Sequence, residues 1–355
     1  MPTKRIEYID ALRGFTMILV VFSHVLLFTF DYNSSFINGL FILFRMPLFF
    51  FISGFIGYKA NLVWNRQTWC TMSKKKLLVQ LLPTLVFGLI YTYAYRHLDY
   101  EAFFEGHGKL GYWFTIVLLE MFLLLYTTNV ICYCEDQQKF KKRVFTSLIV
   151  LSVIMFGLTI LLKSEPSLRS GFHLFSFDLC CKHFPYFAFG YLCSMHRETF
   201  NKALSSQHFP TIIIVAFAIL FSVDYYYFKP HLGNSLLCFT LKEFVNRILG
   251  FLGLLIVYNT FRVYQSSFTT EKKVGRALQY IGKRTLDIYL LHYFFLPSLP
   301  QLGVELFSEG KNATLELVMG LLLSLIIIGL CVVVSNILRT SPLLAQYLFG
   351  VKSKK

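Results

Sequence analysis

Long apolar runs separated by short polar segments dominate this chain. Each run is long enough to cross the bilayer hydrocarbon as a helix, which takes about 20 residues. The longest connecting segments, 59–76, 96–110 and 262–279, are too short to form a soluble domain. The pattern predicts an all-α polytopic membrane protein of about ten transmembrane helices, at 12–30, 38–58, 77–95, 111–132, 144–162, 174–194, 210–228, 237–261, 280–300 and 315–338.

The domain organisation follows from the same pattern. We expect a single integral-membrane domain with a core of about residues 6–340, followed by a short basic tail at 341–355. We detect no internal repeat, so the sequence gives no positive support to a transporter built from inverted repeats.

Basic residues explain the net charge of +15 by their positions. If the amino terminus is cytoplasmic, and Arg13 is counted with it, 22 of the 34 Lys and Arg residues lie on the inner side and 6 lie in outer loops. This asymmetry follows the positive-inside rule and predicts that both termini are cytoplasmic. The charge therefore indicates membrane topology rather than binding to nucleic acid.

Composition agrees with the hydrophobic pattern. With 55% hydrophobic and 15% charged residues, the chain is more apolar than an ordinary soluble protein. The eight cysteines lie mostly within predicted spans and form no pair of CxxC motifs, so we interpret them as small buried hydrophobic residues. We predict no metal site.

The first predicted span carries two ionisable residues, Arg13 and His24, eleven positions apart. Eleven steps along a helix make three turns plus about 20°, so both side chains share one face at a separation of roughly 16 Å. Ionisable residues inside a span are costly and mark functional sites by default. An arginine can bind phosphate, and a deep histidine can act as a general base near neutral pH. The competing interpretations are a positive-inside anchor for Arg13 and a buried, hydrogen-bonded histidine for His24.

A second deep histidine, His292, lies in the predicted span 280–300. Thr285 and Tyr289 fall on its helical face, whereas Asp287 lies about 140° away and is expected to make another contact. A purely structural hydrogen bond is the alternative role for His292.

Two further candidates lie on the predicted span 111–132. Glu120 has no obvious partner on its own helix, so it must pair with another helix or with a substrate. Trp113 belongs to a group of aromatic residues at the span ends. This group is either an interfacial belt or a platform on which sugar rings stack.

Four motifs occur in a recognisable order: YIDALRG with Arg-x10-His, FRMPLFFFISGF, GYWFTIVLL and IGKRTLDIYLLH. Together they resemble the acyltransferase-3 family over essentially the whole chain. The resemblance implies an O-acyltransferase in the cytoplasmic membrane of a bacterium. It further implies transfer of an acyl group, most often acetyl from acetyl-CoA, to a hydroxyl of a surface or exported glycan or its lipid-linked precursor. Acyl-CoA would be a substrate, with no resident cofactor.

The resemblance also implies roles for individual residues. Arg13 and His24 match the essential pair of the family, with His24 as base or acyl relay and Arg13 as a contact for the donor. His292 is the third catalytic candidate. The remaining motif positions are candidate contacts for donor or substrate, namely Asp10, Arg45, Ser53 and Tyr289.

One family element is altered. An Arg-x3-Arg pair is expected ahead of a proline, and this chain has Lys76 and Gln80 at those positions. Lys74, Lys75 and Lys76 still supply positive charge for the phosphates of CoA. We expect acyl-CoA to dock from the cytoplasm, with its pantetheine arm reaching toward His24.

Two other classes of function remain open. A transporter or flippase for a glycan or acyl donor could use the same charges for passage of its substrate. A structural subunit of a glycan-export complex would tolerate apolar residues at Arg13 and His24. Within the acyltransferase hypothesis, direct transfer and an acyl relay also both remain.

Overall fold

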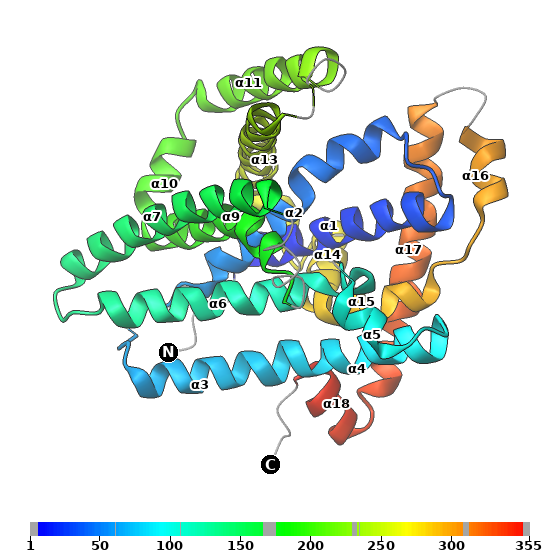
Figure 1. Ribbon diagram of the computed structural model, residues 1–355, viewed down its shortest axis with the longest axis horizontal. Helices are drawn as coiled ribbons and strands as arrows, with labels where there is room; N and C mark the ends of the chain where they lie inside the picture. The colour runs from blue at the N-terminus through cyan, green and yellow to red at the C-terminus, as the bar shows by residue number, and fades with distance from the viewer. Residues whose placement is uncertain are drawn as a thin grey trace. The chain divides into compact units, whose positions relative to one another are not determined.

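The computed structural model describes residues 6–60, 62–106, 108–165, 175–228, 233, 235–307 and 312–350 (Figure 1). Over these ranges the protein is all-helical and contains no strand. The longer helices are α1 (Glu7–His24), α2 (Phe36–Gly57), α3 (Arg66–Lys76), α4 (Leu82–Ile90), α6 (Trp113–Cys132), α7 (Gln137–Ser164), α9 (Phe177–Met195), α11 (Phe209–Val223), α13 (Leu236–Val263), α14 (Lys273–Lys283) and α17 (Ala313–Leu338).

Shorter helices connect these elements. They are α5 (Tyr100–Glu105), α10 (Arg197–Leu204), α15 (Thr285–Leu291), α16 (Pro300–Phe307) and α18 (Pro342–Phe349). Four π-helical segments extend longer helices, namely η1 (Val25–Thr29), η2 (Leu77–Leu81), η3 (Tyr91–Tyr95) and η6 (Asp224–Phe228). Among the described residues, short 3₁₀ segments include η4 (Lys109–Gly111), η7 (Gln265–Phe268) and η8 (His292–Phe295).

Most of the predicted spans are confirmed. Among the described residues, 8 helices are long and apolar enough to cross a membrane. They correspond to the predicted spans beginning at 12, 38, 77, 111, 144, 210, 237 and 315. The predicted span 174–194 corresponds to α9, a helix that contains Pro185 and is not one of the 8, and residue 174 lies outside the described ranges. The protein is thus a polytopic all-α membrane protein, while the total of ten spans and the orientation of the termini stay predictions. Residues 351–355 of the expected basic tail also lie outside the described ranges.

The expected single helix over 280–300 is wrong. The chain forms α14, then breaks at Arg284 (φ −110°, ψ 14°), and continues as α15 and η8. The break falls at the polar residues Lys283, Arg284 and Thr285, which the prediction included in one continuous helix. The break separates α15, which carries Thr285 and Asp287, from α14.

Capping and proline effects explain other element boundaries. The side chains of Asn65, Asp136 and Asn312 accept hydrogen bonds from backbone N–H groups in the first turns of α3, α7 and α17. The π-helical segment η2 ends two residues before Pro83, whose backbone nitrogen has no hydrogen to donate to the preceding turn. Together, α3, η2, α4 and η3 form one helix from Arg66 to Tyr95, which is longer than the predicted span 77–95.

The chain divides into two compact units. Unit 1 comprises Met1–Phe49 and Leu249–Leu344, and unit 2 comprises Phe50–Ile248 and Ala345–Lys355. The boundaries fall inside the continuous helices α2 and α13. The prediction of a single domain stays a prediction.

Unit 1 is organised around α1, which packs against α14 and α17. The backbones of α1 and α14 cross at two glycines. A Cβ atom at Gly14 would lie 2.0 Å from the carbonyl oxygen of Leu278, and one at Gly282 would lie 1.9 Å from that of Asp10. Small residues permit such close approach in membrane helices. The crossing therefore fixes how α1 and α14 lie against each other.

Unit 2 contains a similar glycine contact. Its helices α6, α7 and α9 pack together, and α3 packs along α6. A Cβ at Gly54 would lie 2.0 Å from the carbonyl oxygen of Phe187, and one at Gly190 would lie 2.0 Å from that of Phe51. This contact joins the FFFISGF segment of α2 to α9. The glycine of that motif therefore has a packing role.

We expect Gly14→Ala to lower the stability of the folded protein by about 2 kcal/mol or more, because the added methyl must push two backbones apart. Thermal unfolding of the purified protein in detergent measures this effect. Gly329→Ala in α17 is the matched control, since a Cβ there meets nothing within 4 Å. The control should be neutral or slightly stabilising. Equal melting temperatures for both variants would contradict the close crossing.

Candidate active site

Two histidines far apart in the sequence meet in unit 1. His24 is the last residue of α1, and His292 is the first residue of η8. Nδ1 of His24 lies 2.8 Å from Nε2 of His292, and the two rings stack with centroids 5.0 Å apart at 12°. His292 is fully buried, whereas His24 is partly exposed. The structure therefore pairs the two predicted histidines directly.

The hydrogen bonds assign the protons of a neutral pair. Nδ1 of His292 lies 3.0 Å from the carbonyl oxygen of Ile288, which can only accept a hydrogen bond. That nitrogen must therefore carry the proton, which leaves Nε2 of His292 as an acceptor. His24 then donates from Nδ1, and its own Nε2 keeps a lone pair. His292 thus fixes His24 in the tautomer that a general base requires.

Aromatic rings border His24. The ring of Phe28 lies 5.4 Å from the imidazole and that of Tyr293 lies 5.2 Å away, measured between centroids. Phe28 is 56% exposed, so this side of the site is open. Tyr289, the other predicted residue here, is buried on α15 with its ring 6.1 Å from that of His292. These rings give the base an apolar setting.

Arg13 is hydrogen-bonded to α15, the short helix that precedes His292. Its guanidinium donates to the hydroxyl of Thr285 at 2.9 Å, at the start of α15, and lies 3.8 Å from the carboxylate of Asp10. The side chain of Arg13 is 31% exposed, so part of the guanidinium can reach a ligand. The sequence placed Thr285 beside His292, but its hydroxyl instead serves Arg13. The α15 segment is thus joined to α1 near both of its ends.

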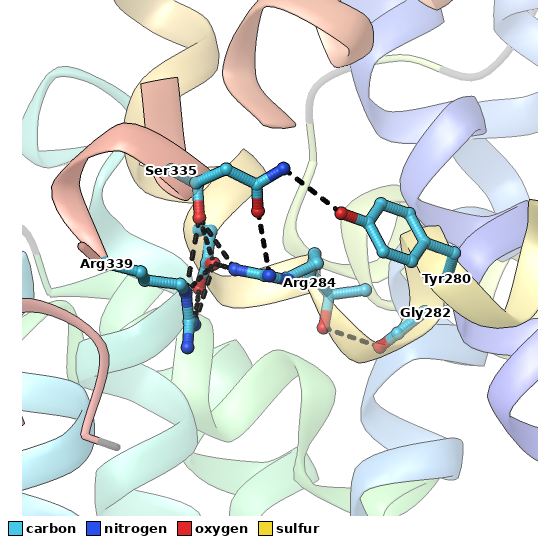
Figure 2. Close-up of polar contacts among 8 residues, drawn as sticks. Tyr280, Gly282, Arg284, Ser335 and Arg339 are labelled. Carbon is cyan, nitrogen blue, oxygen red and sulfur yellow. Dashed lines mark hydrogen bonds and ion pairs between the residues drawn. The ribbon is translucent and has the colours of Figure 1, made fainter. Parts of the chain in front are cut away.

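Asp287 joins α15 to the end of α17. This confirms the prediction that its side chain makes a contact away from the His292 face. Its side chain is only 3% exposed, and the guanidinium of Arg339 donates to both of its oxygens, at 2.8 and 2.9 Å. The hydroxyl of Ser335 donates to it at 2.5 Å, and Arg284 at 3.2 Å. Figure 2 shows Arg284 and Arg339 converging on this point next to Ser335.

Arg284 extends this network along the same face. It also donates to the amide oxygen of Asn336 at 2.8 Å, and the amide of Asn336 donates to the hydroxyl of Tyr280 at 3.3 Å (Figure 2). Residues on both sides of the break at Arg284 are therefore bonded to the end of α17. We call the group of Asp287, Arg284, Arg339 and Ser335 the Asp287 clamp. It holds α15, and with it His292, in a defined position.

Arg45 has a buried guanidinium in unit 1. Its Nε and one terminal nitrogen are buried and have no hydrogen-bond partner among the described residues. Its positive charge acts on His24 and Tyr293. A buried, unpaired cation is costly. Arg45 is therefore available to an anion or a developing negative charge beside the histidine pair.

The other predicted site residues lie in unit 2. Ser53 is half-buried on α2, next to the close-packed Gly54. The indole of Trp113 stacks on the ring of His183, with centroids 5.7 Å apart. Oε2 of Glu120 is buried without a hydrogen-bond partner among the described residues. None of these contacts distinguishes a structural role for the three residues from a role in ligand binding.

Lys76 lies over the ring of Phe122, with its ammonium nitrogen 3.5 Å from the centroid. Gln80, the other altered position, is buried, and its side-chain oxygen has no partner among the described residues. Lys59 lies in the segment before α3, and its pKa is lowered by partial burial and by the nearby charge of Lys75. Positive charges therefore lie close together in the basic cluster predicted for the CoA phosphates, and their mutual repulsion favours binding of an anion.

One buried acid was missed by the sequence analysis. Glu316 lies in the first turn of α17 and is 2% exposed. Its carboxylate accepts from the hydroxyl of Tyr32 at 3.0 Å and from that of Ser35 at 2.6 Å. These bonds anchor the connection between η1 and α2, immediately after the His24 helix. The only signal for it in the sequence is an acid at the start of an apolar run.

Comparison with known proteins adds the family. The acyltransferase domain family matches residues 6–337. No curated protein and no solved structure matches the chain significantly. The family match covers nearly the whole chain, including Arg13, His24 and His292. The chain therefore belongs to the acyltransferase-3 family and is an integral-membrane acyltransferase.

Proposed function

We propose that this protein transfers an acyl group from acyl-CoA to a hydroxyl of a surface or exported glycan, or of its lipid-linked precursor. Acetyl is the favoured group, and the cytoplasmic membrane of a bacterium the favoured location, because both are typical of the family. The observation that carries the proposal is the hydrogen-bond chain from the Ile288 carbonyl through His292 to His24. It leaves Nε2 of the partly exposed His24 as a base for a hydroxyl nucleophile.

In the proposed reaction, Nε2 of His24 takes the proton of the acceptor hydroxyl. The oxygen attacks the thioester carbonyl carbon, and negative charge develops on the carbonyl oxygen. The carbon–sulfur bond then breaks, and the CoA sulfur receives the proton from the His24 imidazolium. The products are an ester and CoA with a free thiol. His292 keeps the imidazole oriented throughout, as the third group of a catalytic triad does.

Arg45 supplies positive charge for the oxygen of the tetrahedral intermediate. Fixed charge in a site that excludes water stabilises such an oxyanion more strongly than in solution. Its two buried, unpaired nitrogens are the support for this role.

Arg13 is proposed to contact a phosphate of the donor while it bonds to Thr285. We expect Arg13→Lys to raise KM for acyl-CoA about tenfold, because an ammonium has no planar fork to serve both partners. Steady-state kinetics over a range of acyl-CoA concentrations measures this. Asp10→Asn, which removes the other partner of Arg13, serves as a comparison and should change KM less. An unchanged KM in Arg13→Lys would leave Arg13 as a topological anchor.

Measuring how many acyl esters the surface glycans of the host carry tests the proposed function. Surface glycans from a strain that lacks the gene are compared by mass spectrometry with those from strains complemented by wild type or by His24→Ala. We expect an acyl increment that is lost on deletion, restored by wild type and not restored by the variant. The mass of the increment identifies the acyl group. Identical glycans in all strains would refute the proposal.

A further inference from the structure

Unit 2 contains a basic pocket that the acyl-transfer proposal does not use. It has a volume of about 610 Å³ and lies between the end of α6 and the first turns of α7. Its lining residues are Ile131, Cys132, Lys139, Lys142, Arg143, Thr146 and Ser147. None of the seven is acidic, and three carry positive charge. We infer that this pocket binds the headgroup of an anionic phospholipid.

The charge in the pocket is largely uncompensated. Lys139 pairs with Asp136 at 3.5 Å, but that carboxylate also caps α7 by accepting two backbone hydrogen bonds. Lys142 and Arg143 are exposed on the helix surface. The segment that contains them, between the predicted spans 111–132 and 144–162, is predicted to be cytoplasmic by the positive-inside rule. Topology alone requires basic residues in this segment, but it does not require them to line a pocket.

The order of side chains along α7 distinguishes a lipid from a soluble anion. Lys139, Arg143, Thr146, Val150 and Val153 follow each other at spacings of four, three, four and three residues, so they form one stripe. The stripe passes from cations to a hydroxyl and then to apolar residues, with Val150 51% and Val153 66% exposed. A phospholipid presents its phosphate, glycerol esters and acyl chain in the same order.

The wall of the pocket formed by α6 also combines polar and apolar groups. Ile131 at the end of α6 is 75% exposed, and the thiol of Cys132 lies 3.3 Å from the hydroxyl of Ser147. The pocket is thus polar where it meets the basic residues and apolar where it faces the hydrocarbon. A free phosphate or a nucleotide would leave this apolar wall uncovered. Basic pockets on the cytoplasmic side of membrane proteins commonly bind anionic headgroups.

The test uses the purified full-length protein in detergent, titrated with phosphatidylglycerol or phosphatidylcholine and followed by native mass spectrometry. We expect one phosphatidylglycerol to bind at least about tenfold more tightly than phosphatidylcholine. The triple variant Lys139→Gln/Lys142→Gln/Arg143→Gln should lose this preference. The matched control, Lys202→Gln/Lys272→Gln/Lys273→Gln, removes the same charge from exposed positions outside the pocket and should retain the preference.

The remaining outcomes also decide the question. If the triple variant does not fold, Arg143→Gln alone should lower the preference about threefold. No preference in wild type, or equal loss in the control, overturns the proposal. Competition by millimolar inorganic phosphate or by CoA would assign the pocket to a soluble anion and overturn it as well. Acyl transfer is not part of the readout, so this inference and the proposed function can fail separately.

Discussion

His24→Ala is expected to lower the rate of acyl transfer about 1,000-fold or more while leaving the amount of protein in the membrane unchanged. The reason is that Nε2 of His24 is the proposed base, and its side chain is partly exposed at the end of α1, so its removal leaves no closed cavity. Turnover of purified variants with acyl-CoA, normalised to folded protein, measures the effect. Added imidazole should restore part of the activity by occupying the space that the side chain leaves.

Two companion variants separate catalysis from packing. His208→Ala removes an exposed histidine in a connecting segment and should keep wild-type activity. His292→Phe leaves His24 in place but removes the group that sets its tautomer, so we expect an intermediate loss of about 100-fold. If His24→Ala retained most of its turnover, the assignment of the base would be wrong. If His292→Phe matched wild type, the orienting role of His292 would be wrong.

Asp287→Ala is expected to destabilise the protein by about 3 kcal/mol, because it leaves the mostly buried guanidinium groups of Arg284 and Arg339 without their carboxylate. Thermal unfolding in detergent and the yield of folded protein measure this loss. Glu198→Ala, which removes an exposed acid from α10, is the control and should change stability by no more than about 0.5 kcal/mol.

A double-mutant cycle sharpens this test. If Asp287 and Arg339 act as one unit, Asp287→Ala/Arg339→Ala should cost clearly less than the sum of the two single variants. Strict additivity would show that the two residues stabilise the fold independently. Because the clamp also positions His292, surviving Asp287→Ala protein should turn over more slowly, with a similar KM for the donor.

Much of the fold could be predicted from the sequence, because apolar length determines which segments can cross a bilayer. The placement of Arg13 and His24 on one helix also followed, since helical periodicity relates residues that are near in the chain. The error over 280–300 has a physical cause. The break lies at the polar residues Lys283, Arg284 and Thr285, but the α17 residues that bond to Arg284 there lie about 50 residues later in the chain.

The partners within the site could not be predicted in the same way. His24 and His292 are 268 residues apart, and Asp287 and Arg339 are 52 apart. The hydrophobic pattern cannot predict contacts between residues so far apart in the chain. The family motifs identified both histidines but did not indicate that one would set the proton position of the other. For Thr285, helical geometry predicted a position beside His292, but its hydroxyl instead accepts a hydrogen bond from Arg13.

The glycine crossing of α1 and α14 acts as a fulcrum. On α1, Gly14 precedes His24 by ten residues of continuous helix, so this imidazole lies at the end of a lever arm, whereas the break at Arg284 separates Gly282 from His292. On α1 the arm is about 15 Å long, and a tilt of about 4° at the crossing would move His24 by about 1 Å. A displacement of that size can cost two orders of magnitude in rate. Catalytic precision in this enzyme would then depend on two residues that have no side chain.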